Sequence, residues 1–272
     1  MNRRWFLKGG MGLLAGMVSA GAYGMGVEPE RLGVERIRIP AGGEGLGGLE
    51  GMRVVALSDF HLHPFTQSAF LREAFQLAGS LKPDLVVLLG DFVDADAAAV
   101  EEFPELLREM NPRLGVFGVL GNHDRKKGAR VVLEGMRKGG VEMLVNRGVL
   151  LGEGHGVWIG GLDSCAGRPD LGMALEGRPE KAPTLLMAHE PDVADAVARD
   201  GRVHVQLSGH SHGGQINVPG VVHGALPEWG RKYAFGSYRV GSLFLHTSRG
   251  LGMTGFPMRF RSPPEVTQLD WG

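Results

Sequence analysis

The sequence predicts an α/β protein in which helices cover two packed β-sheets. Residues 53–57, 85–89 and 115–120 are apolar runs typical of buried strands, and the intervening segments 68–81 and 97–110 have helical periodicity. This alternation is the signature of parallel strands joined by right-handed crossovers. After residue 140 strand-like runs become more frequent, which predicts a second sheet packed on the first.

Local signals place the individual elements. Ser68 is a candidate N-cap of the first helix, Pro112 closes the second, and Gly139 ends a third helix over residues 126–138. The remaining predicted elements are a first strand at 34–39, hairpin strands at 149–151 and 157–159, strands at 184–188 and 203–207 around a short helix at 193–199, and strand-like sequence from 233 onward.

The first 26 residues have the pattern of an export signal. Arg3 and Arg4 precede Trp5-Phe6-Leu7-Lys8 and a weakly apolar run, which resembles a bacterial twin-arginine signal peptide. Ala20-Gly21-Ala22 is a candidate cleavage site, and without cleavage the segment would be an N-terminal membrane anchor. We therefore expect a signal or anchor at 1–26, a linker with a first strand at 27–51, and the main domain at 52–272. The twin-arginine export machinery would deliver the protein to the periplasm or the outer face of the cytoplasmic membrane.

Bulk composition excludes several classes of protein. A net charge of -1 over 272 residues provides no basic field, so no specific nucleic-acid binding is expected. The single cysteine, Cys165, rules out a disulfide framework and a cysteine zinc cluster. The 45 glycines suggest many tight turns, which suits a site built from loop tips.

Five polar clusters each follow an apolar strand. Ligands bind at the carboxyl ends of strands in α/β sheets, so the five clusters are expected to converge. Their side chains mix imidazole with oxygen ligands and include no thiolate, which suits manganese, iron or zinc. Within two of the clusters the candidates are separated by one residue, and an extended chain would point both the same way. The candidate ligands are Asp59, His61, Asp91, Asn122, His189, His210 and His212.

Two divalent metal ions, most simply manganese, are the expected cofactors. Asp91, at the end of the most apolar strand, is the candidate bridge between them. Bound metal lowers the pKa of water from 15.7 to about 7, which supplies a metal-bound hydroxide nucleophile, and two metals can hold both oxygens of an in-line displacement at phosphorus. His123 is the candidate acid for the leaving oxygen, with Asp124 orienting it. The alternative for His123 is a supporting structural role.

Together these motifs resemble the calcineurin-like metallophosphoesterase superfamily. Its pattern is Asp-x-His, Gly-Asp, Gly-Asn-His-Asp/Glu, a lone His and Gly-His-x-His, and all five motifs occur in order between Met52 and Gly214. The resemblance implies a four-layer α/β/β/α sandwich with two mixed sheets. It also implies one metal held by Asp59, His61, Asp91 and His212, and a second held by Asp91, Asn122, His189 and His210.

Further sequence motifs are similar to those of the exported bacterial phosphodiesterases of the YkuE/YaeI type. The shared runs are His189-Glu190-Pro191-Asp192 and Arg249-Gly250-Leu251-Gly252. Asp94 stands where purple acid phosphatases carry an iron-binding tyrosine, so a coloured iron site is not expected. Arg249 is a candidate phosphate clamp, with a structural role as the alternative.

The expected function is therefore that of an exported, dinuclear-metal phosphodiesterase. A phosphomonoesterase and a non-catalytic metal-binding envelope protein are the alternatives. The expected partner is a lipid- or nucleotide-derived phosphoester, with membrane association through the N-terminus. Residues 220–237, which include Trp229 and Tyr233, are candidates for shaping specificity.

Overall fold

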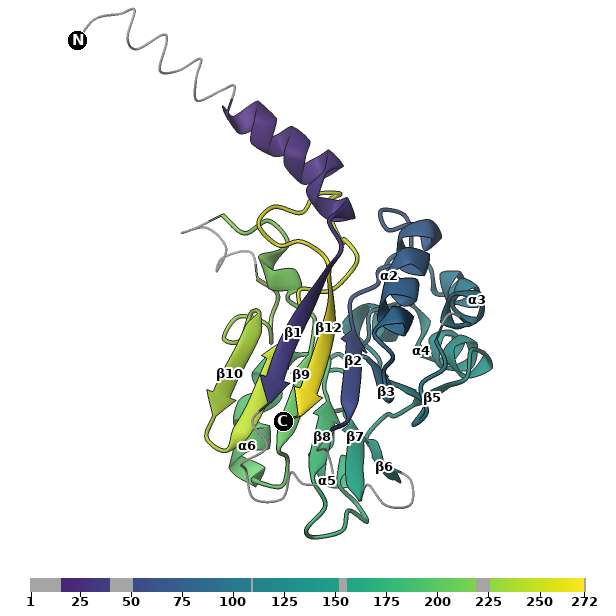
Figure 1. Cartoon of the computed structure of the whole chain (residues 1–272), viewed down its shortest axis with the longest axis vertical. Helices are drawn as coiled ribbons and strands as arrows, with labels where there is room; N and C mark the ends of the chain where they lie inside the picture. Colours follow the sequence, from purple (N-terminus) through teal and green to yellow (C-terminus); the bar gives the residue numbers. More distant parts are fainter. Residues whose placement is uncertain (1–15, 40–50, 109, 152–155, 219–225, 272) are drawn as a thin grey trace, which may run out of the picture.

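Two six-stranded sheets pack face to face, with helices on the outer side of each (Figure 1). The computed structural model describes residues 16–39, 51–108, 110–151, 156–218 and 226–271. The layer order is helix, sheet, sheet, helix. The predicted α/β/β/α sandwich with two mixed sheets is therefore confirmed.

The first sheet has the strand order β1-β12-β2-β3-β4-β5. Strands β2 to β5 are parallel, β12 runs antiparallel to β2, and β1 runs parallel to β12. The predicted apolar runs form its centre. The strands are β1 (Gly33–Ile39), β2 (Arg53–Leu57), β3 (Leu85–Leu88), β4 (Val116–Gly118), β5 (Val141–Met143) and β12 (Glu265–Trp271).

Helices on the outer face of this sheet differ from the prediction in three places. The helix predicted over 126–138 begins earlier, at Asn122. Ser68 is the first residue of α2, with Gln67 as a cap that uses no side chain, so the N-cap assigned to Ser68 is wrong. The predicted helix over 97–110 is two shorter pieces, because Pro104 lacks an N–H and begins a new helix. These helices are α2 (Ser68–Ser80), η3 (Ala97–Glu102), α3 (Phe103–Leu107) and α4 (Asn122–Lys138).

The second sheet has the strand order β10-β11-β9-β8-β7-β6. The predicted hairpin is present as the antiparallel pair β6 and β7. The strands of this second sheet are β6 (Arg147–Leu151), β7 (Val157–Gly161), β8 (Thr184–Met187), β9 (Val205–Ser208), β10 (Gly236–Val240) and β11 (Leu243–Thr247). The outer face carries α5 (Leu171–Ala174), η4 (Pro191–Val193) and α6 (Ala194–Asp200), and η5 (His212–Gly214) follows β9.

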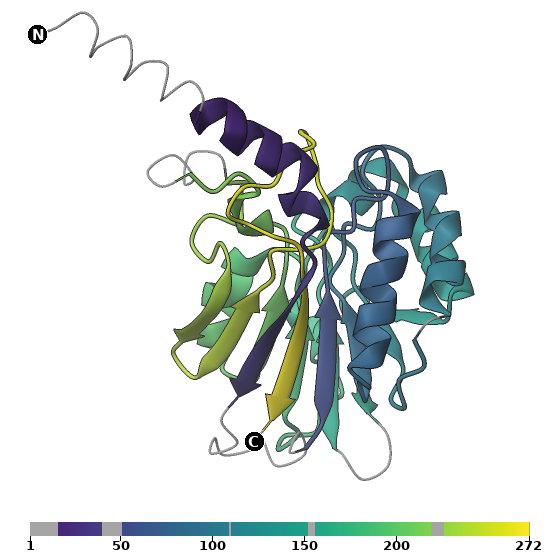
Figure 2. The ribbon, with the colours of Figure 1, turned by 45° about the horizontal axis from the view of Figure 1, so that its top comes forward.

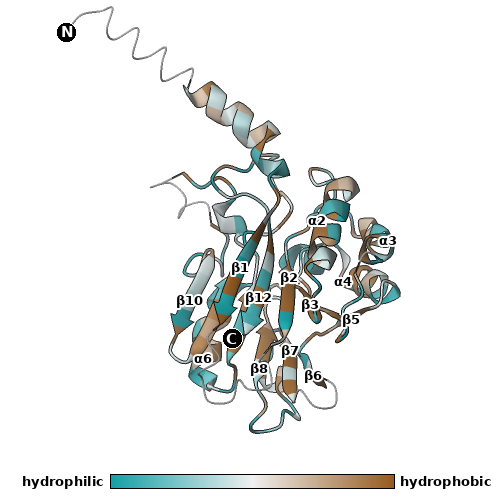
Figure 3. Cartoon of the chain, in the orientation of Figure 1, coloured by the Kyte–Doolittle hydropathy of each residue, from teal (hydrophilic) through white to brown (hydrophobic). Residues whose placement is uncertain are grey.

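Three apolar layers hold the sandwich together. Figure 3 shows hydrophobic residues along β2 and β8, strands of the two sheets. The layer between the sheets includes Val54, Val87, Ile159, Leu185 and Leu207, all fully buried. Burial of this kind contributes roughly 25 cal/mol per Å² of apolar surface. The sheets are therefore fixed relative to each other, and so are the loops at their edges.

The part of the N-terminal segment from Gly24 to Ile39 belongs to the folded domain. Residues 16–26 are helical, η1 (Glu28–Glu30) follows, and β1 then pairs along its length with β12. Glu28 is buried and accepts a 2.6 Å hydrogen bond from the Ser262 amide. The folded domain thus begins before Met52, and the predicted boundary there is corrected. Arg3 and Arg4 lie outside the described residues.

Parallel strands carry the candidate site to one edge. β2, β3 and β4 of the first sheet run parallel to one another, as do β8 and β9 of the second, and the ligand-bearing loops at their carboxyl ends meet (Figure 2). Within the described segments, no helix combines the length and the apolar character needed to cross a membrane.

Candidate metal centre

All seven predicted ligands gather at this edge of the two sheets. Three overlapping groups bring possible metal-binding atoms within 4.8 Å of one another. Asn122 joins them, because its Oδ1 lies 3.3 Å from His189 Nε2. The groups are Asp59 with His61 and His212, His61 with Asp91 and His123, and Asp91 with His189 and His210.

Asp91 lies at the centre of the cluster. Its Oδ2 is 3.4 Å from His61 Nε2 and 3.2 Å from His189 Nε2, and these two rings belong to different groups. Its Oδ1 accepts a 2.8 Å hydrogen bond from the His123 amide. One carboxylate therefore faces both halves of the cluster, in the position that a bridging ligand requires.

Hydrogen bonds on the outer side of three rings fix which nitrogen faces inward. His61 Nδ1 lies 2.9 Å from Asp94 Oδ1, and His189 Nδ1 lies 2.7 Å from the Leu89 carbonyl. His210 Nε2 lies 2.8 Å from the Glu228 carbonyl. Since these oxygens accept, the ring nitrogens donate, and the opposite nitrogen of each ring keeps a free lone pair for a metal ion.

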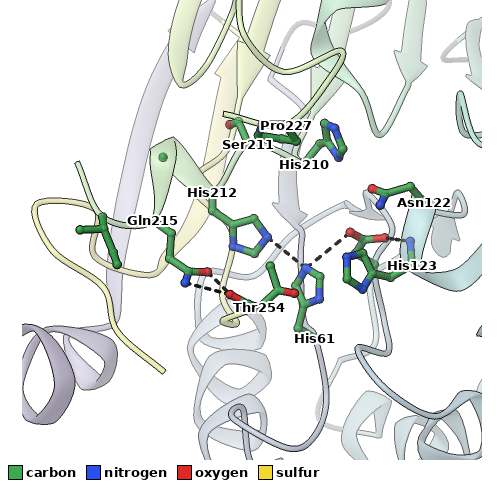
Figure 4. A pocket seen from close by; sticks show the side chains of 12 residues that line it. His61, Asn122, His123, His210, Ser211, His212, Gln215, Pro227 and Thr254 are labelled. Carbon is green, nitrogen blue, oxygen red and sulfur yellow. Dashed lines mark hydrogen bonds and ion pairs between the residues drawn. The ribbon is translucent and has the colours of Figure 1, made fainter. Parts of the chain in front are cut away.

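Two ring nitrogens meet inside the cluster. His61 Nε2 and His212 Nε2 are 3.0 Å apart, and His212 Nε2 is 3.4 Å from Asp59 Oδ1 (Figure 4). Two lone pairs at that distance repel unless a proton or a cation lies between them. The donor set of imidazole and carboxylate suits a first-row divalent metal, so the residues fit the expected ions.

The electrostatics of the cluster favour cations. Burial opposes the charge on His189, but Asp91, through its charge and hydrogen bond, raises the pKa of that ring well above its usual value. Burial also opposes ionisation of Asp91, but His189 outweighs it and holds the Asp91 pKa well below the usual range. Burial lowers the pKa of His212 to about 3, so this ring stays neutral, as a metal ligand must.

The ligands sit in strained backbone rather than in extended chain. The φ angles of Asp59, His61, Asp91, His210 and His212 are 54°, 44°, 54°, 74° and 53°. The expectation that each closely spaced pair points the same way from an extended segment is therefore wrong. Non-glycine residues in this left-handed region cost of order 1–3 kcal/mol each and cluster at functional sites.

Two glycines let the clusters approach one another. A Cβ on Gly121 would overlap the Asp91 carboxylate, and a Cβ on Gly209 would overlap Ser58 and Asp59. Any side chain at these positions would push a ligand-bearing loop out of place.

His123 is held by Asp94. It lies in the first turn of α4, with Nδ1 3.2 Å from Asp94 Oδ1. Thr254 Oγ1 donates to the same oxygen at 2.6 Å. Burial opposes the charge on His123, but the Asp94 hydrogen bond and the Asp91 charge raise its pKa. Its side chain is 25% exposed, so a group in the cavity can reach it.

Asp124 does not orient His123, and that part of the sequence interpretation is wrong. The Asp124 carboxylate is fully buried and accepts hydrogen bonds from backbone amides of two loops. Burial and the nearby Asp91 charge raise its pKa to about 7. Its donors are the amides of Asp91, Phe92, Val93 and Gly121, at 2.9, 2.9, 3.3 and 2.9 Å. Asp124 therefore joins two ligand-bearing loops.

Arg249 is engaged elsewhere. Its guanidinium pairs with Glu265 at 2.5 Å and lies over the Phe235 ring, 5.3 Å from the centroid. It is not among the residues that line the cavity at the cluster. The contacts of Arg249 therefore favour the alternative, a structural role, over the predicted role as a phosphate clamp.

A cavity of about 300 Å³ opens over the cluster (Figure 4). Gln215 and Thr254 lie on one side of it, opposite Asn122 and His123, and Ile216 also lines it. No arginine or lysine is among the described residues that line it. The cavity is therefore walled by potential metal ligands and neutral side chains.

Comparisons with known proteins agree with this geometry. Residues 52–214 match the calcineurin-like phosphoesterase family. The chain is 34% identical to the uncharacterized metallophosphoesterase YkuE of Bacillus subtilis strain 168, over 98% of this chain and 96% of the relative. It is 30% identical to phosphodiesterase YaeI of Escherichia coli K12, over 80% of this chain and 81% of the relative.

A solved structure shows the same fold. A dimetal phosphatase from Danio rerio superposes with a TM-score of 0.50 at 13% identity, over 82% of this chain and all of that one. From the family match and the two relatives, the chain belongs to the calcineurin-like phosphoesterase family.

Proposed function

We propose that this protein is an exported phosphodiesterase that requires two divalent metal ions, with manganese the first choice. The observation that carries the proposal is the convergence of seven ligands around Asp91, beneath a cavity whose described lining has no fixed cation. The family supports hydrolysis of phosphoesters. The preference for diesters, the metal and the export are our inferences.

The chain divides its ligands between two positions. Asp59, His61 and His212 would hold one ion, Asn122, His189 and His210 would hold the other, and Asp91 would be shared. When bound, such ions lower the pKa of water and neutralise charge on a phosphoryl group. Outer hydrogen bonds from His61, His189 and His210 keep their rings in the required orientation.

His123 supplies a proton to the leaving oxygen. Its ring is partly exposed to the cavity, and Asp94 holds Nδ1 so that the other nitrogen is directed away from that carboxylate. Although burial opposes its charge, the Asp94 hydrogen bond and the Asp91 charge raise the pKa of His123, which favours the protonated ring. An alcohol is a poor leaving group and benefits from this proton, whereas nitrophenol departs without it.

The cavity suits a diester better than a monoester. A monoester carries close to two negative charges at neutral pH, and phosphatase sites use arginine or lysine to neutralise such charge. Here the candidate arginine, Arg249, pairs with Glu265 instead. A diester carries one negative charge and needs less compensation. The relative YaeI is named a phosphodiesterase, which agrees.

Export is supported by the sequence and by the contacts of the N-terminal segment. Among the described residues, 16–22 are exposed or half-buried, and the hydrogen bonds to the rest of the domain begin beyond Ala22, with Gly24 O accepting from the Arg259 amide. Cleavage after Ala22 would therefore leave those bonds intact. Replacing Arg3 and Arg4 by lysine should keep the protein in the cytoplasmic fraction, and unchanged fractionation would exclude the twin-arginine route.

Substrate class is tested with the protein lacking residues 1–22. Hydrolysis of bis-p-nitrophenyl phosphate and of p-nitrophenyl phosphate is compared after loading with manganese. We expect a higher kcat/KM for the diester, by about tenfold or more. A preference for the monoester would make the protein a phosphatase, and metal binding without turnover of any phosphoester would favour a non-catalytic envelope protein.

A further inference from the structure

A second cavity of about 280 Å³ adjoins the first. The two cavities share Asn122, His210 and Pro227 in their linings. Asn122 and His210 are ligands proposed for one metal position. A phosphate at the metal centre would therefore face two separate cavities, one for each substituent of a diester.

His123 distinguishes the two cavities, because it lines only the first. The leaving oxygen must lie within reach of this proton donor, so the leaving alcohol faces the first cavity. The substituent that stays on phosphorus then faces the second.

Resting on the proposed phosphodiesterase activity, we propose that the second cavity binds the retained substituent of the substrate, and that this substituent is an uncharged, hydroxyl-bearing ring such as a sugar. Trp229 provides a face for the ring, and Lys126 and Glu228 receive its hydroxyl groups. Three observations carry this assignment.

The first observation is the presentation of Trp229. Its side chain is 48% exposed although it is large and apolar, and its φ of 67° is in the left-handed region. Its carbonyl accepts a 3.0 Å hydrogen bond from the Asp192 amide, and the next turn closes from the Gly230 amide to the Pro227 carbonyl. An indole held in a strained backbone conformation at a cavity wall is a preorganised platform for a ring.

The second observation is the mixed charge of the lining. Lys126 lies one helical turn beyond Asn122 on α4 and has no hydrogen-bond or ion-pair partner among the described residues, and Glu228 is exposed on the facing loop. Glu190 also lines the cavity, but its oxygens accept from Ser164 Oγ at 2.5 Å and from the Cys165 amide at 3.1 Å. Two carboxylates and one ammonium disfavour a second phosphate.

A hydroxyl-bearing ring can interact with both the negative and the positive side chains of this lining. Each hydroxyl donates one hydrogen bond and accepts others, so it can donate to a carboxylate and accept from an ammonium group. Cys165 adds no charge, since burial raises its thiol pKa to about 12. The lining therefore matches a neutral polyol better than an anion or a plain hydrocarbon.

The third observation is the link between this loop and the metal centre. The Glu228 carbonyl accepts from His210 Nε2 at 2.8 Å, so the residue before the platform also orients a ligand. This hydrogen bond ties the backbone beside Trp229 to a ligand of the metal centre, so it would set the position of the ring relative to the phosphate.

The test uses three synthetic diesters that share p-nitrophenol as the leaving group. Their retained substituents are methyl, the 6-position of methyl glucoside, and 3-phosphopropyl. For the manganese-loaded enzyme we expect a kcat/KM for the glucoside ester about tenfold or more above that of the methyl ester, and no comparable gain for the phosphopropyl ester.

Variants then test whether the higher kcat/KM for the glucoside ester depends on the Trp229 indole. Trp229→Ala should reduce the glucoside-to-methyl ratio to near one, mainly through KM, and Trp229→Phe should keep most of it. Phe256→Ala removes a similarly exposed aromatic side chain, 50% exposed and outside both cavity linings, and should keep the ratio. As a binding readout, the product methyl glucoside 6-phosphate should quench tryptophan fluorescence in the wild type and in Phe256→Ala but not in Trp229→Phe.

Each contrary outcome is distinct. Equal kcat/KM for the methyl and glucoside esters in the wild type would overturn the sugar subsite. An equal loss of kcat/KM on the methyl and glucoside esters in Trp229→Ala would show that Trp229 does not bind the sugar and only supports the position of His210. A gain for the phosphopropyl ester would overturn the assignment of an uncharged ligand. Absence of turnover on all three diesters, with metal bound, would instead refute the phosphodiesterase itself.

Discussion

Replacement of Asp124 by alanine should lower the free energy of unfolding, and any loss of activity should follow from that loss of stability. The carboxylate accepts from four buried amides of two loops, those of Asp91, Phe92, Val93 and Gly121. A buried donor left without its partner costs about 1–3 kcal/mol. At the lower end of that range, four such donors sum to about 4 kcal/mol, which for a chain of this size lowers the melting temperature by roughly 8–16 °C.

The two carboxylate oxygens make the asparagine variant informative. Oδ2 accepts from Asp91 and Gly121, and Oδ1 accepts from Phe92 and Val93. Asp124→Asn keeps one acceptor and turns an NH₂ toward the other donors, so it should cost at least half as much as alanine. The free energy of unfolding is measured by urea denaturation of the metal-free protein. Loss of activity with unfolding free energies within about 1 kcal/mol of wild type would refute this account and restore the catalytic role.

Three further variants probe other contacts. Asp94→Asn removes the charge beside both His123 and the ligand His61, so both diester types should lose activity, but hydrolysis of alkyl diesters should fall about 100-fold further than that of nitrophenyl diesters; equal losses on both would argue against proton transfer by His123. Glu265 is buried and its pKa is lowered, because Arg249 and His246 outweigh burial. Its stabilisation is present above the unfolded pKa of about 4.3 and is lost as pH falls through the folded value, so Glu265→Gln should flatten the decline of unfolding free energy below pH 5; an unchanged slope would contradict this. Removal of residues 1–22 should leave the unfolding free energy within about 1 kcal/mol of the full chain, since among the described residues the hydrogen bonds to the rest of the domain begin beyond Ala22, and a larger loss would show that the helix supports the fold.

The convergence of the ligands was predictable because it follows from strand direction. Parallel strands place their carboxyl ends at one edge, so Asp59, Asp91 and Asn122 had to meet once their strands were identified. The pairing of β1 with β12 was not predictable, because the strands are separated by more than 200 residues and no local signal records the partner.

The partner of His123 was missed for a geometric reason. Sequence adjacency suggested Asp124, but α4 begins at Asn122, so consecutive side chains point about 100° apart around the helix. Asp94, three residues beyond Asp91 in the same polar segment, comes from a neighbouring loop and faces the ring. Asp94 could be identified in the sequence as part of this polar segment, but the loop conformation that directs its side chain toward His123 could not be predicted.

The central claim is that Asp91 joins two metal ions in a centre that hydrolyses phosphoesters. The most direct measurement is a manganese titration of the metal-stripped protein, in which bound metal and bis-p-nitrophenyl phosphate hydrolysis are followed together in wild type and Asp91→Ala. We predict two ions per wild-type chain with activity appearing as the second binds, and in Asp91→Ala fewer than two ions and at least a 1000-fold loss of hydrolysis. Full activity with one ion, or wild-type turnover in Asp91→Ala, would contradict the claim.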